Sequence, residues 1–271
     1  MSDLRVIERA SLRALNTFGI DARADRLVVL ERRDQVEAAL AACGPEGPAL
    51  VLGGGSNLLI TRDIPGAVLQ VALSGREHLG QAGDDQIVEA AAGENWHGFV
   101  QWTLAQGLAG LENLSLIPGT AGASPIQNIG AYGVEMRERF TYLTALDRRT
   151  GSIARLQAPE CRFGYRDSLF KHPEGRHWLI LTVAFRLSRC AAPVLSYPAL
   201  AEQLARQGIR QPTAVQVSEA VCAIRRARLP DPARLGNAGS FFKNPVVDAA
   251  VADALRANHP GLPVYADSAP G

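Results

Sequence analysis

Residues 49–60 read ALVLGGGSNLLI and decide the fold, because they place three consecutive glycines at the end of an apolar run. The run over 49–53 predicts a buried strand, and residues 58–60 are expected to resume a strand after the turn. Upstream, residues 27–31 (LVVLE) predict another strand, and residues 34–42 predict a helix. A strand–helix–strand unit that ends in a glycine turn is typical of a nucleotide-binding domain.

The glycine turn offers backbone amides and two polar side chains to a diphosphate, since successive glycine amides form an anion-binding cup. Its members are Gly53, Gly54, Gly55, Ser56 and Asn57. Two known phosphate motifs fail here, because the third glycine of G-x-G-x-x-G is replaced by Leu58 and no Gly-Lys-Ser/Thr occurs. A plain turn between two strands is the alternative, and the residues alone leave both readings open.

A second glycine-rich stretch, residues 117–133 (IPGTAGASPIQNIGAYG), holds few large side chains. Such a loop adds little to a core, so its amides stay available to a ligand, and a flat ring can lie against its backbone. A flexible surface loop is the alternative, which we favour less because Ile126, Ile129 and Tyr132 are expected to anchor the stretch. The sequence therefore predicts a ligand-binding loop, with a short helix after Pro118.

Polar side chains in two further motifs are candidates for chemistry. In CRFGYRDS, Arg166 lies between Tyr165 and Asp167, which are expected to hold its guanidinium in place for an anion. In LGNAGSFFKNP, Ser240 lies between a glycine and two phenylalanines, which predicts a partly desolvated hydroxyl. The ordinary alternatives are a surface charge for Arg166 and a hairpin turn capped by Ser240. No G-x-S-x-G elbow occurs, which disfavours a serine hydrolase.

Periodicity predicts the remaining elements. A helix over 96–106 has Asn95 as its N-cap and Gly107 just after its end. A hairpin is expected over 142–156. Further strands are expected at 67–71, 87–91 and 179–187, and further helices at 199–207, 216–227 and 249–257.

Length, charge and cysteine spacing disfavour several classes of protein. The 271 residues allow one to three domains. A formal net charge of +1 does not indicate binding to nucleic acid or to a membrane surface. No signal peptide and no membrane span is expected, which predicts a cytoplasmic protein. The four cysteines lack C-x-x-C spacing, so we expect buried thiols and no metal site, and the five histidines form no ligand motif.

These segments together resemble the UDP-N-acetylenolpyruvoylglucosamine reductases, of the type that has a tyrosine loop. The resemblance covers the chain from Asn16 to about Pro260. It is carried by NTFGID, LGGGSNLL, GLENLSLIPGTAGASPIQNIGAYGVE, CRFGYRDSLFK, RLPDP and GNAGSFFKNPVV. The family implies an α+β protein, with a two-lobed FAD-binding domain of the vanillyl-alcohol-oxidase (PCMH-type) superfamily followed by an α+β substrate-binding domain. We expect the first lobe over 1–66, the second over 67–210 and an incomplete substrate-binding domain over 211–271.

The resemblance also implies the reaction and its ligands. NADPH would pass hydride to FAD, and the reduced flavin would deliver it to the enolpyruvyl group of UDP-N-acetylglucosamine enolpyruvate. The product would be UDP-N-acetylmuramate, a peptidoglycan precursor. By similarity, Arg166 stabilises the enolate that forms and Ser240 protonates it. A monomer is expected, with no nucleic-acid or membrane partner.

Cofactor and substrate contacts are carried over from the family in the same way. The residues expected to contact FAD are Gly53, Gly54, Gly55, Ser56, Asn57, Pro118, Gly119, Ser124, Gly130, Tyr132 and Arg225. The residues expected to contact the UDP-sugar are Tyr197, Arg228 and Asn244.

Three departures from the family pattern bear on these expectations. Arg228 replaces a lysine before LPDP, and Ala123 replaces a serine, which removes one flavin contact. The family continues beyond Gly271 with a segment that carries a catalytic glutamate, so we expect a truncated chain. Two other hypotheses therefore stay open: a flavin- and UDP-sugar-binding fragment with impaired catalysis, and an FAD oxidase that acts on an alcohol.

Overall fold

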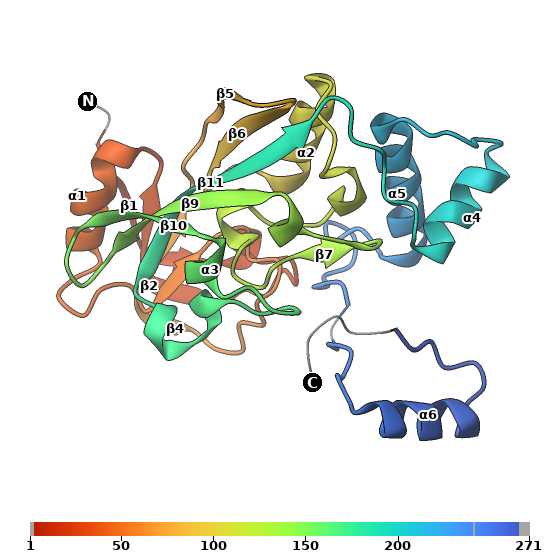
Figure 1. The fold of residues 1–271 in the computed structure, drawn as a ribbon. Helices are drawn as coiled ribbons and strands as arrows, with labels where there is room; N and C mark the ends of the chain where they lie inside the picture. Colours follow the sequence, from red (N-terminus) through yellow and green to blue (C-terminus); the bar gives the residue numbers. More distant parts are fainter. Residues whose placement is uncertain (1–2, 241, 266–271) are drawn as a thin grey trace. The chain divides into compact units, whose positions relative to one another are not determined.

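The computed structural model describes residues 3–240 and 242–265, and the chain divides into two compact units, Met1–Ala238 and Gly239–Gly271. The first unit holds two large β-sheets and helices α1 to α5 (Figure 1). The second unit holds α6 (Ala249–Asn258). Each helix that the sequence predicts is present in the structure.

The first sheet has four strands in the order β1-β2-β4-β3. The first two strands pair antiparallel, whereas β2 and β3 both run parallel to β4. Helix α1 (Val36–Ala42) connects β2 to β3, which confirms the predicted strand–helix–strand unit. The four strands are β1 (Arg5–Ser11), β2 (Arg23–Leu30), β3 (Leu50–Leu52) and β4 (Ile64–Val71).

The chain does not resume a strand after the glycine turn, so the strand predicted at 58–60 is wrong. These residues lie outside any ladder, and β4 occupies the place beside β3 instead. Leu58 packs against a hydrophobic cluster and Ile60 is buried, whereas Leu59 is 56% exposed. Leu58 and Ile60 therefore anchor a loop.

The second sheet has five strands in the order β10-β9-β11-β6-β5, antiparallel throughout. Its central strand β11 is almost wholly buried and pairs with β9 on one side and β6 on the other. The predicted hairpin is confirmed as β9 and β10. The five strands are β5 (Arg76–Ala82), β6 (Asp85–Ala91), β9 (Phe140–Asp147), β10 (Ile153–Gln157) and β11 (Trp178–Ser188).

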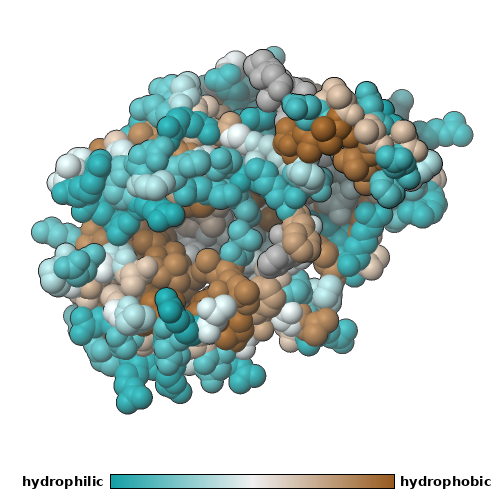
Figure 2. Space-filling view, turned by 90° about the horizontal axis from the view of Figure 1, so that it is seen from below, coloured by the Kyte–Doolittle hydropathy of each residue, from teal (hydrophilic) through white to brown (hydrophobic). Residues whose placement is uncertain are grey.

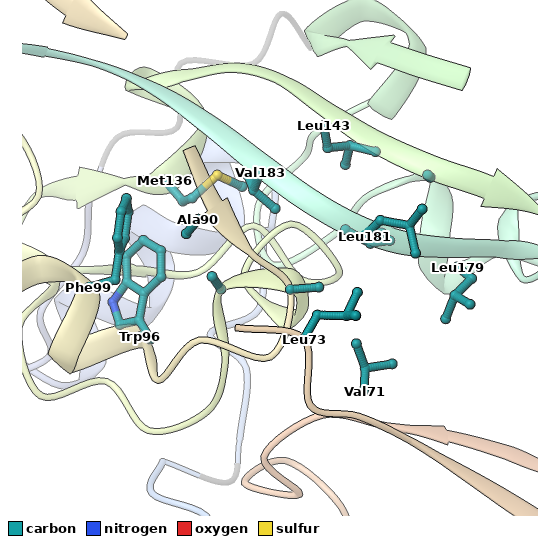
Figure 3. Packing of buried hydrophobic residues seen from close by; sticks show 14 of the residues in the cluster. Val71, Leu73, Ala90, Trp96, Phe99, Met136, Leu143, Leu179, Leu181 and Val183 are labelled. Carbon is teal, nitrogen blue, oxygen red and sulfur yellow. The ribbon is translucent and has the colours of Figure 1, made fainter. Parts of the chain in front are cut away.

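The largest hydrophobic core joins both sheets to helix α2 (Trp96–Ala105). Figure 3 shows Trp96 and Phe99 of α2 beside Met136, and Val71 near Leu181 of the central strand. Asn95 caps the helix by accepting a hydrogen bond from the Gly98 amide at 2.8 Å. The sequence-predicted cap and apolar face are thus confirmed, and they fix the first turn of α2 in the interior.

The inner strands of the first sheet, β2 and β4, are buried on both faces along much of their length. Val28 and Leu30 of β2 point into the large core, whereas the intervening Leu27 and Val29 belong to a second cluster. The continuous apolar run in β2 follows from this arrangement, because a strand covered on both sides cannot alternate with polar residues. The glycine turn follows β3 at the edge of this rigid sheet.

Helices α4 (Pro198–Arg206) and α5 (Ala214–Arg228) pack on each other around a third small cluster. Helix α5 also contacts the 3-10 turn Glu112–Leu114, which precedes the second glycine-rich stretch. This contact brings the C-terminal end of α5 to that stretch. The remaining short elements are α3 (Ala158–Cys161), β7 (Gly130–Ala131) and β8 (Val134–Glu135).

The surface is mixed in character. Figure 2 shows a face on which hydrophilic side chains predominate and hydrophobic ones gather in separate places. Within residues 3–240 and 242–265, no helix has the length and apolar character that a bilayer span requires.

Candidate active site

The two glycine-rich segments meet backbone to backbone. A Cβ atom placed on Gly54 would lie 2.9 Å from the Cα of Gly119, and one placed on Gly53 would lie 2.8 Å from the Thr120 Oγ1. Gly119 has φ +115, and a Cβ there would lie 2.9 Å from the Ser56 Oγ. Side chains at the three glycines would therefore separate the two segments. Their absence lets the segments form one continuous backbone surface, which we call the backbone cradle.

The glycine turn is held from behind by the N-terminal part of the chain. Gly55 has φ +60, and a Cβ there would collide with the Leu15 carbonyl oxygen. The Thr17 amide donates to the Gly55 carbonyl at 3.2 Å. The Thr17 carbonyl in turn accepts from the Asn237 amide at 3.1 Å. Segments from both ends of the first unit thus brace the turn.

The amides of this turn remain available to a ligand. Within the described part of the chain, residues 53–57 donate no backbone hydrogen bond. The Asn57 side chain donates to Gln127 Oε1 at 3.1 Å, which links the turn to the second loop. Consecutive amides without protein partners form the kind of cup that binds a diphosphate. The site therefore fits the diphosphate of a dinucleotide cofactor.

Backbone strain gathers in the second loop and its neighbours. Leu116, Asn128, Tyr132 and Arg166 all have φ between +43 and +59, although none is a glycine. Such conformations cost free energy and persist only where surrounding contacts hold them. Side chains supply those contacts, as the buried Asn128 illustrates by donating to the Gly164 carbonyl and to Glu135 Oε2, each at 2.9 Å.

The Arg166 guanidinium is fixed on the second loop. Its Nη2 donates to the Gly130 carbonyl at 2.6 Å, and it lies over the Tyr165 ring, 5.2 Å from the centroid. The prediction that Asp167 holds the Arg166 guanidinium is wrong, because the Asp167 carboxylate pairs with His172 at 3.1 Å. The carboxylate near Arg166 is Glu135, 3.9 Å away. The sequence offered no signal for this pairing across the chain.

A second polar cluster, formed by Arg225 and Tyr132, lies beside the second glycine-rich loop. Arg225 donates through Nε to the Leu116 carbonyl at 3.1 Å and shares a hydrogen bond with the Tyr132 hydroxyl. Burial raises the pKa of Tyr132 and lowers the pKa of Arg225. The Tyr132 and Tyr197 rings meet edge to face, with centroids 5.2 Å apart. Tyr132, which is predicted for the cofactor, thus contacts both Arg225, also predicted for the cofactor, and Tyr197, predicted for the substrate.

Asn113 was not predicted and ties this cluster together. It is 1% exposed, and its Nδ2 donates both to the Tyr132 carbonyl at 2.8 Å and to the Val194 carbonyl at 2.9 Å. The second carbonyl belongs to the loop that leads to Tyr197. Asn113 therefore couples the two loops that carry the aromatic pair.

The remaining predicted site residues have varied surroundings. Ser124 is buried, and its hydroxyl donates to the Ala121 carbonyl at 2.7 Å, so it supports the turn of the loop. Pro118 is exposed, and Arg228 is exposed in the last turn of α5. Ser240 and Asn244 belong to the second unit, and their place in the site stays a prediction.

Two smaller expectations need correction. Ile126 is 37% exposed and does not anchor the loop, whereas Ile129 is buried as expected. Cys190 is exposed, because it lies in the loop after the last sheet strand, while the other three cysteines are buried. Burial raises the pKa of Cys161 to about 12. Among the residues that the structure covers, no cluster of His, Cys, Asp and Glu suits a metal ion.

Comparison with known proteins assigns the fold. The family described as FAD binding domain matches residues 24–157. The crystal structure of 6-hydroxy-D-nicotine oxidase from Arthrobacter nicotinovorans shares the fold, with a TM-score of 0.50 and 20% identity over 68% of this chain and 42% of that one. Together with the backbone cradle, these matches define a flavoprotein built on an FAD-binding domain.

Closer relatives identify the family. UDP-N-acetylenolpyruvoylglucosamine reductase from Pseudomonas putida is 54% identical over 95% of this chain and 76% of the relative. The enzyme of that name from Chromobacterium violaceum is 57% identical over 94% and 75%. The crystal structure of UDP-N-acetylenolpyruvylglucosamine reductase from Thermus caldophilus matches with a TM-score of 0.64 and 26% identity, over 90% of this chain and 76% of that one.

The chain belongs to the UDP-N-acetylenolpyruvoylglucosamine reductase family. The resemblance seen in the sequence is thereby confirmed, as are the α+β fold and the prediction of an FAD-dependent oxidoreductase.

Proposed function

We propose that this chain uses NADPH to reduce the enolpyruvyl ether of UDP-N-acetylglucosamine enolpyruvate to UDP-N-acetylmuramate, a step in peptidoglycan precursor synthesis. One observation carries the proposal. Residues 118–132 take part in two features: Gly119 forms the backbone cradle with Gly54, and the Gly130 carbonyl holds the Arg166 guanidinium at 2.6 Å. This loop would therefore join a diphosphate-binding surface to an anion-stabilising cation.

The cradle residues are proposed to hold FAD. The unpartnered amides of residues 53–57 would bind the diphosphate, and residues 118–132 would lie against the flavin. Tyr132 and Arg225 would border the same surface, since they are hydrogen-bonded to each other. When bound, FAD supplies the hydride that it has accepted from NADPH.

Arg166 is proposed to stabilise the negative charge that develops on the substrate. Hydride addition to the enolpyruvyl methylene carbon leaves charge on the neighbouring carbon and on its carboxylate. A guanidinium that is already oriented stabilises this charge without reorganising during the reaction. The hydrogen bond to Gly130 and the contact with the Tyr165 ring support this role, because both restrain the guanidinium.

Ser240 is proposed to donate the proton that completes the reduction. A carbanionic carbon is strongly basic, so even a hydroxyl can protonate it. The role comes from the family resemblance of GNAGSFFKNP.

The substrate contacts and the setting of the reaction complete the proposal. Tyr197, Arg228 and Asn244 are proposed to bind the UDP-sugar, and the lobes to span 1–66 and 67–210, with a substrate-binding domain from residue 211. The chain is proposed to act as a monomer in the cytoplasm. Light scattering of the purified protein tests the monomer.

The proton-donor role is tested with Ser240→Ala in stopped-flow measurements. Reduction of the flavin by NADPH should keep its wild-type rate, whereas reduction of the UDP-sugar should fall by about 10²- to 10⁴-fold. Ser74→Ala, at an exposed position, is the matched control and should change neither rate. Equal loss of both half-reactions in Ser240→Ala would refute the role.

The overall activity is tested by steady-state oxidation of NADPH with the authentic UDP-sugar. Turnover by residues 1–271 would support a working reductase and eliminate the hypothesis of an impaired binding fragment. Absence of turnover with the flavin bound would favour that fragment. Oxygen consumption with an alcohol in place of the UDP-sugar would favour an oxidase.

A further inference from the structure

The backbone of Leu116 is hydrogen-bonded through both its amide and its carbonyl group. Its amide donates to the Nδ1 of His97 at 3.0 Å, and its carbonyl accepts from the Nε of Arg225 at 3.1 Å. The residue has φ +59, a conformation that a branched side chain rarely adopts. These two hydrogen bonds hold the strained residue from two helices, α2 and α5.

The first turn of α2 fixes both ends of the following segment. Next to His97 in the sequence, the Trp96 amide donates to the Gly119 carbonyl at 3.1 Å. The segment from Leu116 to Gly119 is therefore bonded to α2 at each end. Gly119 is the residue that contacts Gly54 in the backbone cradle. A release of Leu116 would consequently alter the geometry of the cradle.

The contact demands one particular form of the His97 ring. A ring nitrogen that accepts a hydrogen bond carries no proton, so the neutral ring must hold its proton on Nε2. The charged groups that face His97 are Arg225 and Arg226 of α5, and both are cations. Burial, together with these two arginines, lowers the pKa of His97. The surroundings thus favour the neutral form that the contact needs.

We propose that His97 is a positioning residue for the FAD-binding loop, and that it acts as a neutral Nδ1 acceptor that keeps Leu116 in the left-handed conformation. This inference rests on the proposed assignment of residues 118–132 to FAD. Protonation of Nδ1 would place an N–H against the Leu116 amide and remove the acceptor. The loop would then leave its strained conformation, and FAD would bind more weakly.

The pH dependence has a definite sign. A histidine with a lowered pKa stays neutral below the ordinary value near 6.5, so the hydrogen bond persists at neutral pH. Its contribution is present above the ordinary value and is lost as the pH falls through the pKa of the folded protein. FAD affinity should therefore decrease on acidification.

FAD titration of the apoprotein, followed by flavin fluorescence, tests the proposal with two variants. His97→Asn keeps an acceptor oxygen close to the position of Nδ1 but does not titrate, whereas His97→Leu has no acceptor. His97→Leu should weaken FAD binding by about tenfold, because it leaves a shielded N–H without a partner. His97→Asn should bind within about threefold of the wild type and should lose the decrease on acidification.

His78→Asn, at an exposed position, is the matched control and should behave as the wild type. Wild-type affinity in His97→Leu would overturn the proposal, and so would an equal loss in His97→Asn and His97→Leu. Urea unfolding of each apoprotein identifies a variant that fails to fold. If His97→Leu does not fold, the loss of acid sensitivity in His97→Asn decides the question.

Nitrogen NMR of the His97 ring tests the contact without any flavin. A proton on Nε2 and a bare Nδ1 at neutral pH are expected, and a proton on Nδ1 would overturn the inference. This measurement also separates two failures. If residues 118–132 did not bind FAD, the His97 variants would keep wild-type FAD affinity while the ring would keep the expected tautomer.

Discussion

Gly54 and Gly119 lie in backbone contact, so close that a methyl group on Gly54 would approach the Cα of Gly119 to 2.9 Å. The two residues come from different loops, one between β3 and β4 and the other beyond helix α2. Their contact is what turns two glycine-rich segments into one surface.

Gly54→Ala should therefore separate the loops. Because the obstacle is backbone rather than a flexible side chain, the substitution should cost about 1–3 kcal/mol in the free energy of unfolding. FAD affinity should fall as well. Urea unfolding and FAD titration measure the two effects. Gly261→Ala, where nothing lies within 4 Å of the added methyl group, is the control. Unchanged FAD affinity in Gly54→Ala would contradict the cradle.

Glu135→Gln should impair the substrate half-reaction. Glu135 pairs with Arg137 at 2.8 Å and lies 3.9 Å from Arg166, so its charge helps to orient the Arg166 guanidinium. Loss of that charge should slow reduction of the UDP-sugar by roughly tenfold, since a misplaced group is costly in catalysis. Reduction of the flavin by NADPH should be unchanged in stopped-flow traces. Glu174→Gln, in an exposed ion pair, is the control.

Asn113→Leu should uncouple the two loops that carry Tyr132 and Tyr197. The substitution leaves two carbonyl groups without their donor, which should cost about 2 kcal/mol in the free energy of unfolding. Limited proteolysis should then cut the loop around Val194 faster than in the wild type. Asn258→Leu makes the same exchange at an exposed position, and it should show neither effect.

The stability of the protein at alkaline pH should depend on Cys161. Burial raises its pKa from 9.0 to about 12, so the thiol stays protonated in the folded state while the unfolded chain ionises. Its contribution is complete below pH 9.0 and declines as the pH rises towards about 12. Urea midpoints should fall less steeply over this range in Cys161→Ala. Cys190→Ala, at the exposed cysteine, should keep the wild-type slope.

Local sequence signals predicted the interior elements well. Helix α2 followed from Asn95 and from the apolar residues of its inner face, because capping and periodicity act within a few residues. The edge strands β1 and β5 were not predicted. Both expose most of their described side chains, so neither has the alternating apolar pattern that marks a half-buried strand.

The candidate site was predicted only in its short motifs. The glycines of the backbone cradle are visible in the sequence, because several glycines close together mark a region without side chains. The contacts that hold the loops were not visible, since Arg225 reaches Leu116 across 109 residues and Asn113 reaches Val194 across 81. No periodicity links such distant positions. The carboxylate near Arg166 is missed for the same reason, because the sequence indicates its neighbour Asp167 and gives no signal for Glu135.

Thr17 makes two backbone hydrogen bonds, one to Gly55 and one to Asn237, and these have a consequence for folding. Closing so long a stretch of chain is entropically costly, so this pairing forms only after the sheets and helices between the two partners are in place. The glycine turn, which we propose to bind the diphosphate, is therefore expected to be completed late, when the remainder of the first unit already exists. Newly made chains would acquire their affinity for flavin abruptly, at the end of folding, rather than gradually along the way.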